Sequence, residues 1–125
     1  MTDLDTKLRA AERIGAILKA RREHQDMSQR DVAHILGYRN INFISMIESG
    51  RSNPPLARLA DIARAYGMDA DFVPVMLREI YPETWEIIKS LLIQYKEVLL
   101  DKGPAALEKQ MDKSLTKYMK DFGIS

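Results

Sequence analysis

MSQRDVAHILGYRNINFISMIESGR, residues 27–51, is the stretch that decides the fold of this chain. Its first part predicts a short helix over residues 28–36, because Ser28 is a good N-cap and Asp31 follows three positions later, as in a capping box. Gly37 comes next, and a glycine stops a helix there because it adopts the left-handed backbone without strain. The stretch therefore opens with a short helix and a tight turn.

A second short helix is predicted over residues 41–49, starting near Asn40 or Asn42 and ending at Gly50. Small Ala33 in the first helix lets the two helices cross closely. The apolar residues of the second helix have helical spacing and are Phe43, Ile44 and Ile47. Two helices joined in this way form a helix-turn-helix, which places its second helix in the major groove of DNA.

The remainder of the chain also has helical periodicity, with no useful alternating strand pattern and no internal repeat. Proline and glycine mark the boundaries between the segments. The predicted fold class is therefore all-α. The expected helices cover roughly residues 6–22, 28–36, 41–49, 56–66, 70–80, 82–102 and 104–122.

Composition limits the class of protein. Of the 125 residues, 46% are hydrophobic and 30% are charged, as in ordinary globular proteins. There is no cysteine, which excludes disulfides and thiolate metal sites. No apolar run approaches the ~20 residues that span a membrane, and the start MTDLDTKL lacks a signal-peptide core. We therefore expect a cytoplasmic protein without a membrane partner, nucleoid-associated when it is bound to DNA.

The net charge of +1 hides a difference between the two halves of the chain. Residues 1–67 carry 11 Lys and Arg against 8 Asp and Glu, and nine of the 11 are arginine. Residues 68–125 carry 8 against 10, and seven of the eight are lysine. Arginine is the better bidentate partner for phosphate and guanine, so the first half suits a nucleic-acid surface. The excess is small, however, and arginine also suits a solvated helix surface.

From about Ile14 to Gly67 the chain resembles the lambda-repressor-like helix-turn-helix family, also called the Cro or XRE type. The resemblance implies a five-helix DNA-binding domain over residues 1–80. The ordered set of matching residues is specific, although each motif alone is weak. It comprises Ile14, Leu18, Arg22, Ser28-Gln29, Ala33, Leu36-Gly37, Ile44-Ser45, Ile47-Glu48, Gly50-Arg51, Asn53-Pro54, Leu56, Leu59, Ala60, Ala63 and Gly67.

The resemblance also implies which residues contact DNA. They are Gln29, Arg39, Asn40, Ile41, Asn42, Ser45, Met46, Arg51 and Ser52. Gln29 would bond a phosphate or an outer base, and Asn42 would pair with adenine. Ile41 and Met46 would touch a thymine methyl. The alternatives are that Ile41 is a hydrophobic staple at the helix start and that Met46 packs in the core or at the surface. Arg51 and Ser52 would anchor the DNA backbone, and Arg39 would reach a phosphate or a guanine.

Within the resemblance, Arg22 and Glu48 are expected to form a partly buried ion pair that ties the first helix to the recognition helix. Two unrelated surface charges are the alternative. The chain departs from the family pattern at Asp26, where glycine is common, and Asp tolerates the left-handed region well. It also carries one extra residue in the turn Tyr38-Arg39-Asn40, which affects where the recognition helix starts.

Residues 81–125 predict a helical hairpin with two apolar stripes on its first helix. One stripe has heptad spacing and is the predicted dimer seam: Trp85, Ile88, Leu92, Tyr95 and Leu99. The second stripe contains Ile87, Leu91 and Val98. We favour a homodimer held by the hairpin, because DNA readers of this type bind paired half-sites. The alternative is that the hairpin folds back on the DNA-binding unit of its own chain.

The predicted function is a homodimeric transcriptional repressor that binds an inverted-repeat operator in double-stranded DNA. The alternative is an antitoxin that binds its own promoter and neutralises a partner protein, since the C-terminal apolar surface is wide. A third class, an enzyme or a small-molecule sensor with Trp85 and Tyr95 at its pocket, has less support. His24 and His34 stand ten residues apart without a carboxylate in register, so we expect no catalytic residues, metal or cofactor.

Overall fold

A computed structural model describes residues 2–94 and 103–125. These residues form seven α-helices and one 3₁₀ turn and contain no strand, which confirms the all-α class. None of the described helices is long and apolar enough to cross a membrane. In chain order the elements are α1 (Asp3–His24), α2 (Gln29–Leu36), α3 (Asn42–Ser49), η1 (Leu56–Arg58), α4 (Leu59–Ala65), α5 (Phe72–Ile80), α6 (Pro82–Gln94) and α8 (Gly103–Asp121).

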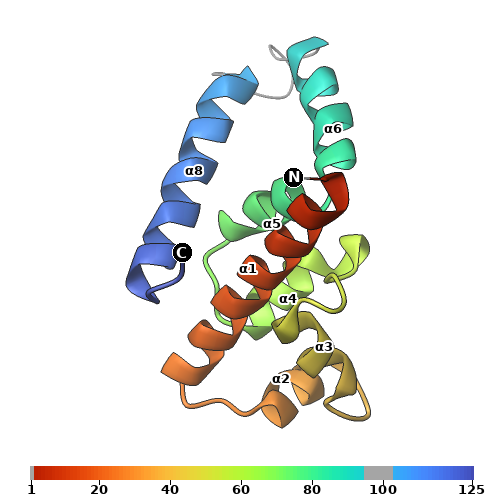
Figure 1. Ribbon diagram of the computed structural model, residues 1–125, viewed down its shortest axis with the longest axis vertical. Coiled ribbons are helices and arrows are strands. Elements are labelled where there is room, and N and C mark those ends of the chain that lie inside the picture. The colour runs from red at the N-terminus through yellow and green to blue at the C-terminus, as the bar shows by residue number, and fades with distance from the viewer. Residues whose placement is uncertain (1, 95–102) are drawn as a thin grey trace.

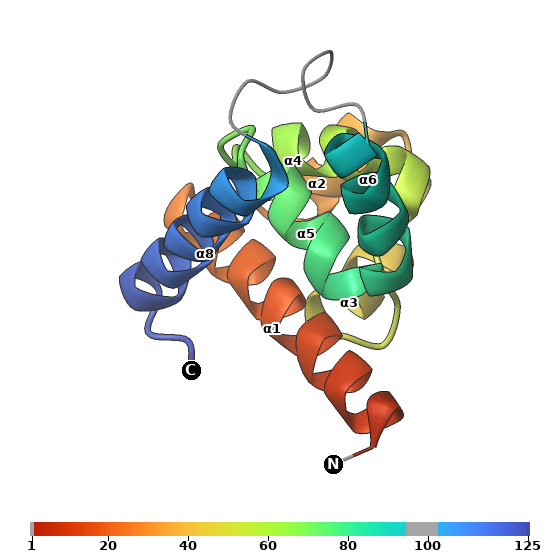
Figure 2. The ribbon, with the colours of Figure 1, turned by 90° about the horizontal axis from the view of Figure 1, so that it is seen from above.

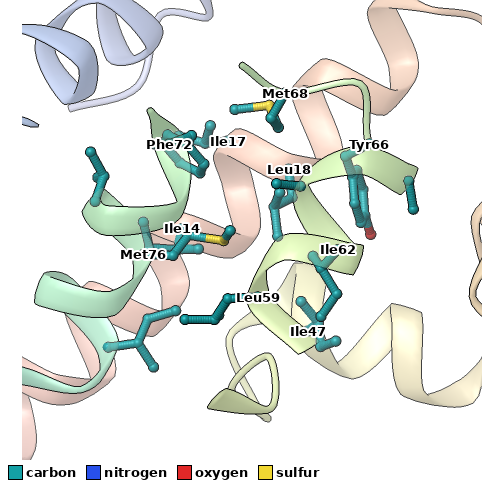
Figure 3. Packing of buried hydrophobic residues seen from close by; sticks show 14 of the residues in the cluster. Ile14, Ile17, Leu18, Ile47, Leu59, Ile62, Tyr66, Met68, Phe72 and Met76 are labelled. Carbon is teal, nitrogen blue, oxygen red and sulfur yellow. The ribbon is translucent and has the colours of Figure 1, made fainter. Parts of the chain in front are cut away.

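Helices α1 to α5 surround one apolar core (Figure 1). The long helix α1 contacts α3 and α5, and α4 packs between α2 and α5. Figure 3 shows side chains of α1, α4 and α5 meeting at the centre of this core. Each such apolar side chain contributes roughly 1.5–3 kcal/mol when it is fully buried. The largest fully buried ones include Ile14, Ile17, Leu18, Ile44, Ile47, Ile62, Tyr66, Phe72 and Met76.

The local signals of the sequence act as predicted around α2. The Ser28 hydroxyl accepts a hydrogen bond from the Asp31 N–H at 3.0 Å, and the Asp31 carboxylate accepts one from the Ser28 N–H at 2.8 Å. Gly37 ends the helix in the left-handed region with φ of 81°. Asp26 takes the left-handed backbone with φ of 55°, as expected for the position where glycine is common. These residues fix both ends of α2 and its connection to α1.

The first helix begins earlier than the sequence suggested, at Asp3 instead of residue 6. Thr2 caps it, because its hydroxyl accepts from the Asp5 N–H at 3.1 Å and the Asp5 carboxylate bonds the Thr2 N–H. Farther along α1, a Cβ atom at Gly15 would collide with the main-chain carbonyl of Glu48 in α3. Gly15 therefore allows α1 and α3 to approach closely. The sequence did not predict this role, because Gly15 lies inside a helix.

The C-terminal helices pack on their own chain. Helix α6 leaves the body after α5, and α8 returns along α5 (Figures 1 and 2). Trp85, Met111 and Tyr118 are 4%, 1% and 5% exposed and belong to the same core as helices α1 to α5. At the far end of α8, Phe122 lies against His24 with ring centroids 4.9 Å apart. Within the described residues, α8 is part of the body of the protein.

The dimer seam expected from the heptad spacing needs correction. Trp85 is buried in the core and Ile88 packs against it, so both are used within the chain. Leu92 is half-buried, while Tyr95 and Leu99 lie outside the described residues. The heptad spacing therefore marks the face of α6 that packs on its own chain, because α8 supplies cover that the first sixty-odd residues do not.

The second stripe of α6 is the uncovered one. Ile87 and Leu91 are 64% and 47% exposed, and the neighbouring Ile93 is 61% exposed. Val98, the other member of this predicted stripe, lies outside the described residues. We call Ile87 and Leu91, which lie four positions apart on one side of the helix, the α6 patch. It lies at the opposite end of the long axis from α2 and α3 (Figure 1).

Candidate nucleic-acid interface

Helix α3 has two chemically different faces. Ile44, Ile47 and Glu48 are buried, and they face α1 and the core. The opposite face is exposed and carries no charged side chain; it consists of Asn42, Ser45, Met46 and Ser49. The short helix thus combines a fixed inner face with an outer face of amide, hydroxyl and thioether groups. Such groups match the donors, acceptors and methyl groups that bases present in the major groove.

The inner face of α3 is held by a polar cluster around Glu48. Arg22 donates from Nε to Oε2 and from Nη2 to Oε1, both at 2.8 Å, so the pair is bidentate. The Tyr66 hydroxyl donates to Oε2 at 2.7 Å, and the Gln29 amide donates to Oε1 at 3.2 Å. We call these four residues the Glu48 cluster. It joins α1, α2 and α3 with Tyr66 at the end of α4.

The electrostatics of this cluster follow from its burial. The side chains of Arg22 and Glu48 are only 10% and 2% exposed. Burial by itself raises the pKa of the Glu48 carboxyl, but the hydrogen bonds from its three donors outweigh it and hold the pKa below its ordinary value. Burial and the bond to Glu48 raise the pKa of Tyr66, which therefore stays a neutral donor. The carboxylate remains charged and fully bonded.

Arg22 does more than pair with Glu48. Its Nη1 donates to the Met27 carbonyl at 2.9 Å, in the segment that leads into α2. One guanidinium thus fixes both the start of α2 and the end of α3. Because the fork of arginine is rigid and planar, these bonds set the angle of α3 relative to α2. The contacts expected from the resemblance therefore exist, and they place α3 firmly in the fold.

The turn with the extra residue has two fixed points. The Asn40 Oδ1 accepts a hydrogen bond from the Asn42 N–H at 3.0 Å, which closes an Asx turn at the start of α3. The Tyr38 ring packs edge-on against Phe43, with centroids 5.3 Å apart. The Asn40 oxygen is thus engaged in the turn, and the resemblance had placed Asn40 among the residues that contact DNA. Asn40 is exposed, so its amide nitrogen is the group that faces solvent.

Arg58 also contacts this turn. The sequence analysis did not predict a role for this residue. Its guanidinium carbon lies 5.2 Å from the centroid of the Tyr38 ring. Its Nη2 donates to the Leu36 carbonyl at 3.0 Å, one of the last carbonyls of α2. Such a carbonyl has no partner inside its helix, so the arginine satisfies it. The turn is therefore held in one conformation on both faces.

The other residues expected at the interface lie around α3. Ile41 is 39% and Met46 is 41% exposed, so neither is a core residue. The N–H groups of Arg51 and Ser52 both donate to the Met46 carbonyl, and the Arg51 side chain is exposed. Gln29 is half-buried and donates to Glu48, so its amide nitrogen is partly engaged inside the protein. Arg39 is exposed in the turn.

Comparison with known proteins agrees with this geometry. A family model described as helix-turn-helix matches residues 18–73, which run from α1 into the first turn of α5 and include the whole Glu48 cluster. No curated protein and no solved structure matches the chain. Residues 18–73 thus belong to the lambda-repressor-like, Cro/C1-type helix-turn-helix family, and the protein is a DNA-binding transcriptional regulator.

Proposed function

We propose that this protein is a sequence-specific repressor that binds an inverted-repeat operator as a homodimer, with α3 in the major groove. The observation that supports it is the outer face of α3. That face is uncharged and exposed, while its inner face is fixed by the Glu48 cluster. A helix that is fixed in this way presents its side chains to bases without a large ordering cost.

The base contacts would come from one end and one side of α3. Asn42 stands in the first turn, where its amide can pair with N6 and N7 of adenine. Ser45 lies one turn later and can bond a base or a phosphate. Ile41 and Met46, both about two-fifths exposed, are suited to the thymine methyl group.

The backbone contacts would flank these residues. Gln29 and the free N–H groups at the start of α2 would bond one phosphate, since a helix N-terminus favours anions. Arg51 and Ser52 follow α3 and would anchor the backbone on its other side, while Arg39 and the Asn40 amide would approach it from the turn. These contacts would set the register of α3 and contribute most of the salt-dependent affinity.

The second copy would join at the α6 patch. The patch lies at the opposite end of the long axis from α2 and α3, so an interface there leaves both recognition helices free (Figure 1). The patch consists of large aliphatic side chains with exposed fractions of 47% to 64%, and burial against an identical patch would remove them from water. To bind an inverted repeat, such a two-fold dimer must present both copies of α3 on the same side, about 34 Å or one turn of DNA apart.

Selection of bound fragments from random DNA, followed by a footprint, tests the proposal. We expect an enriched inverted repeat with half-site centres about 10 base pairs apart, protected on one face of the duplex. Enrichment of a single half-site without symmetry would overturn the dimeric arrangement. The absence of any enriched sequence would overturn sequence-specific binding.

The dimer has a test of its own. The double substitution Ile87→Asp with Leu91→Asp would bury two charges in the interface, so the variant should be monomeric in light scattering and lose most operator affinity. Leu56→Asp is the control, because Leu56 is an exposed leucine of η1 outside the patch. A double variant that remains dimeric with full affinity would place the interface elsewhere. An unrelated chain bound stoichiometrically in protein from the native host would instead favour the antitoxin function.

A further inference from the structure

The surface beside the α2–α3 turn contains a hollow of about 350 Å³. Two side chains of α2, Arg30 and His34, are among the residues that line it. Tyr38 and Arg39 from the turn and Ile41, just before α3, line it as well. Arg30 and His34 are absent from the DNA contacts that the sequence implied. The hollow nevertheless lies directly beside the end of α3 that would enter the groove.

The charge of this hollow is positive. Arg30 and Arg39 are exposed, and neither forms an ion pair with the acidic groups in the described part of the chain. The acidic group on α2 is Asp31, which interacts with His34. Its carboxylate already accepts the N–H of Ser28 in the cap of α2. Two guanidinium groups are therefore available to an anion, and His34 supplies a further nitrogen donor.

The back of the hollow is rigid. The Tyr38 ring is fixed between Phe43, at 5.3 Å, and the guanidinium of Arg58, at 5.2 Å. The bond from the Asn42 N–H to Asn40 closes the turn just after Arg39. The backbone that carries Arg39 is thus held in place before any ligand arrives, so an anion would need to order only the arginine side chains.

We propose that this hollow is a seat for one phosphate of the DNA backbone at the edge of the major groove, bound by Arg30 and Arg39 together with His34. The inference rests on the proposed function, because the phosphate is that of the operator contacted by α3. Arginine binds phosphate oxygens in a bidentate manner, and the hollow has room for the phosphodiester and ordered water. Arg39, which belongs to the lengthened turn, would thereby supply one half of the seat.

The salt dependence of operator affinity tests the seat. Each neutralised phosphate adds about 0.9 to the slope of log affinity against log salt. When salt is raised from about 50 to 200 mM, the affinity of each protein falls. The fall for the double variant Arg30→Ala with Arg39→Ala should be about threefold smaller than the fall for the wild type. Each single variant should show part of this change, because the two guanidiniums share one phosphate. His34→Ala should weaken binding at both salt concentrations.

Two control variants sharpen the test. Lys109→Ala lowers the net charge by one at an exposed position of α8, a helix that lies away from α2 and α3 (Figure 1), and should keep the wild-type slope. Arg30→Lys with Arg39→Lys keeps both charges and should restore the slope, with lower affinity because the bidentate geometry is lost. A double alanine variant with native helical circular dichroism and the wild-type slope overturns the seat. Wild-type protein without sequence preference overturns the proposed function instead.

Discussion

Helix α3, the second helix of the helix-turn-helix, and the C-terminal helix α8 are both held by polar contacts, but in different surroundings. Around α3, the paired side chains of Arg22 and Glu48 are 10% and 2% exposed. On α8, Asp112 pairs with Arg78 at 2.7 Å, yet the Asp112 side chain is 69% exposed. Water and salt screen the second pair and not the first. The structure thus fixes the orientation of α3 by buried charges and attaches α8 mainly by apolar packing.

The largest effect is expected for Glu48→Ala. The substitution leaves Arg22 buried without its carboxylate and Tyr66 without its acceptor. Breaking a buried pair from one side costs about 3–5 kcal/mol, which is a large part of the stability of a domain. Urea unfolding followed by circular dichroism measures this loss. A cost below about 1 kcal/mol would mean that the cluster is as replaceable as a surface pair.

The same cluster gives a pH dependence. The pKa of Glu48 is lowered in the folded state, so its contribution to stability is present above its ordinary pKa and is lost as pH falls through the lowered value. The urea midpoint of the wild type should therefore decrease below about pH 4. Glu48→Gln should be less stable at neutral pH and should show a smaller decrease in acid. An identical acid profile in both proteins would assign the effect to other carboxyl groups.

A smaller loss is expected for Tyr118→Phe on α8. The Tyr118 hydroxyl donates to the Asp69 carboxylate at 2.7 Å and accepts from the Asp69 N–H, while its ring packs on Phe72. Phenylalanine keeps the packing and removes the bonds, so the loss should be about 1 kcal/mol. Thermal unfolding measures it. A loss as large as that of Glu48→Ala would mean that α8 also depends on its polar contacts.

The smallest effect is expected for Asp112→Ala, which removes the exposed partner of Arg78. Surface pairs contribute about 0.2–1 kcal/mol, and Arg78 keeps its bond to Glu79. Urea unfolding in low and high salt checks this value, and any effect should diminish as salt rises. A decrease in the free energy of unfolding above about 2 kcal/mol that does not depend on salt would mean that the exposed pair on α8 stabilises the protein as a buried pair does.

Local features were predictable from the sequence, because each depends on residues close together in the chain. The cap formed by Ser28 and Asp31, the stop at Gly37 and the left-handed Asp26 are of this kind. The partnership of Arg22 with Glu48 came from the family resemblance, since 26 residues separate the two. The sequence did not indicate that the Asn40 oxygen closes an Asx turn at the start of α3, and the DNA contact of Asn40 stays a prediction.

Features that depend on distant packing were not predictable. The heptad spacing of α6 showed that Trp85 and Ile88 share a face, but periodicity does not say which surface covers that face. The structure covers it within the chain and leaves Ile87 and Leu91 exposed. Likewise, nothing in the turn indicated that Arg58 would stack on Tyr38, because the contact joins segments 20 positions apart.

A binding comparison of two proteins on two duplexes shows whether the outer face of α3 reads the operator. Binding of Asn42→Ala is compared with that of the wild type on the selected operator and on a scrambled duplex of equal length. We expect a loss of about 1–3 kcal/mol on the operator and an unchanged affinity for the scrambled duplex, because the proposed partner of Asn42 is a base. Equal operator affinity for both proteins would contradict the assignment of this face of α3 to the bases.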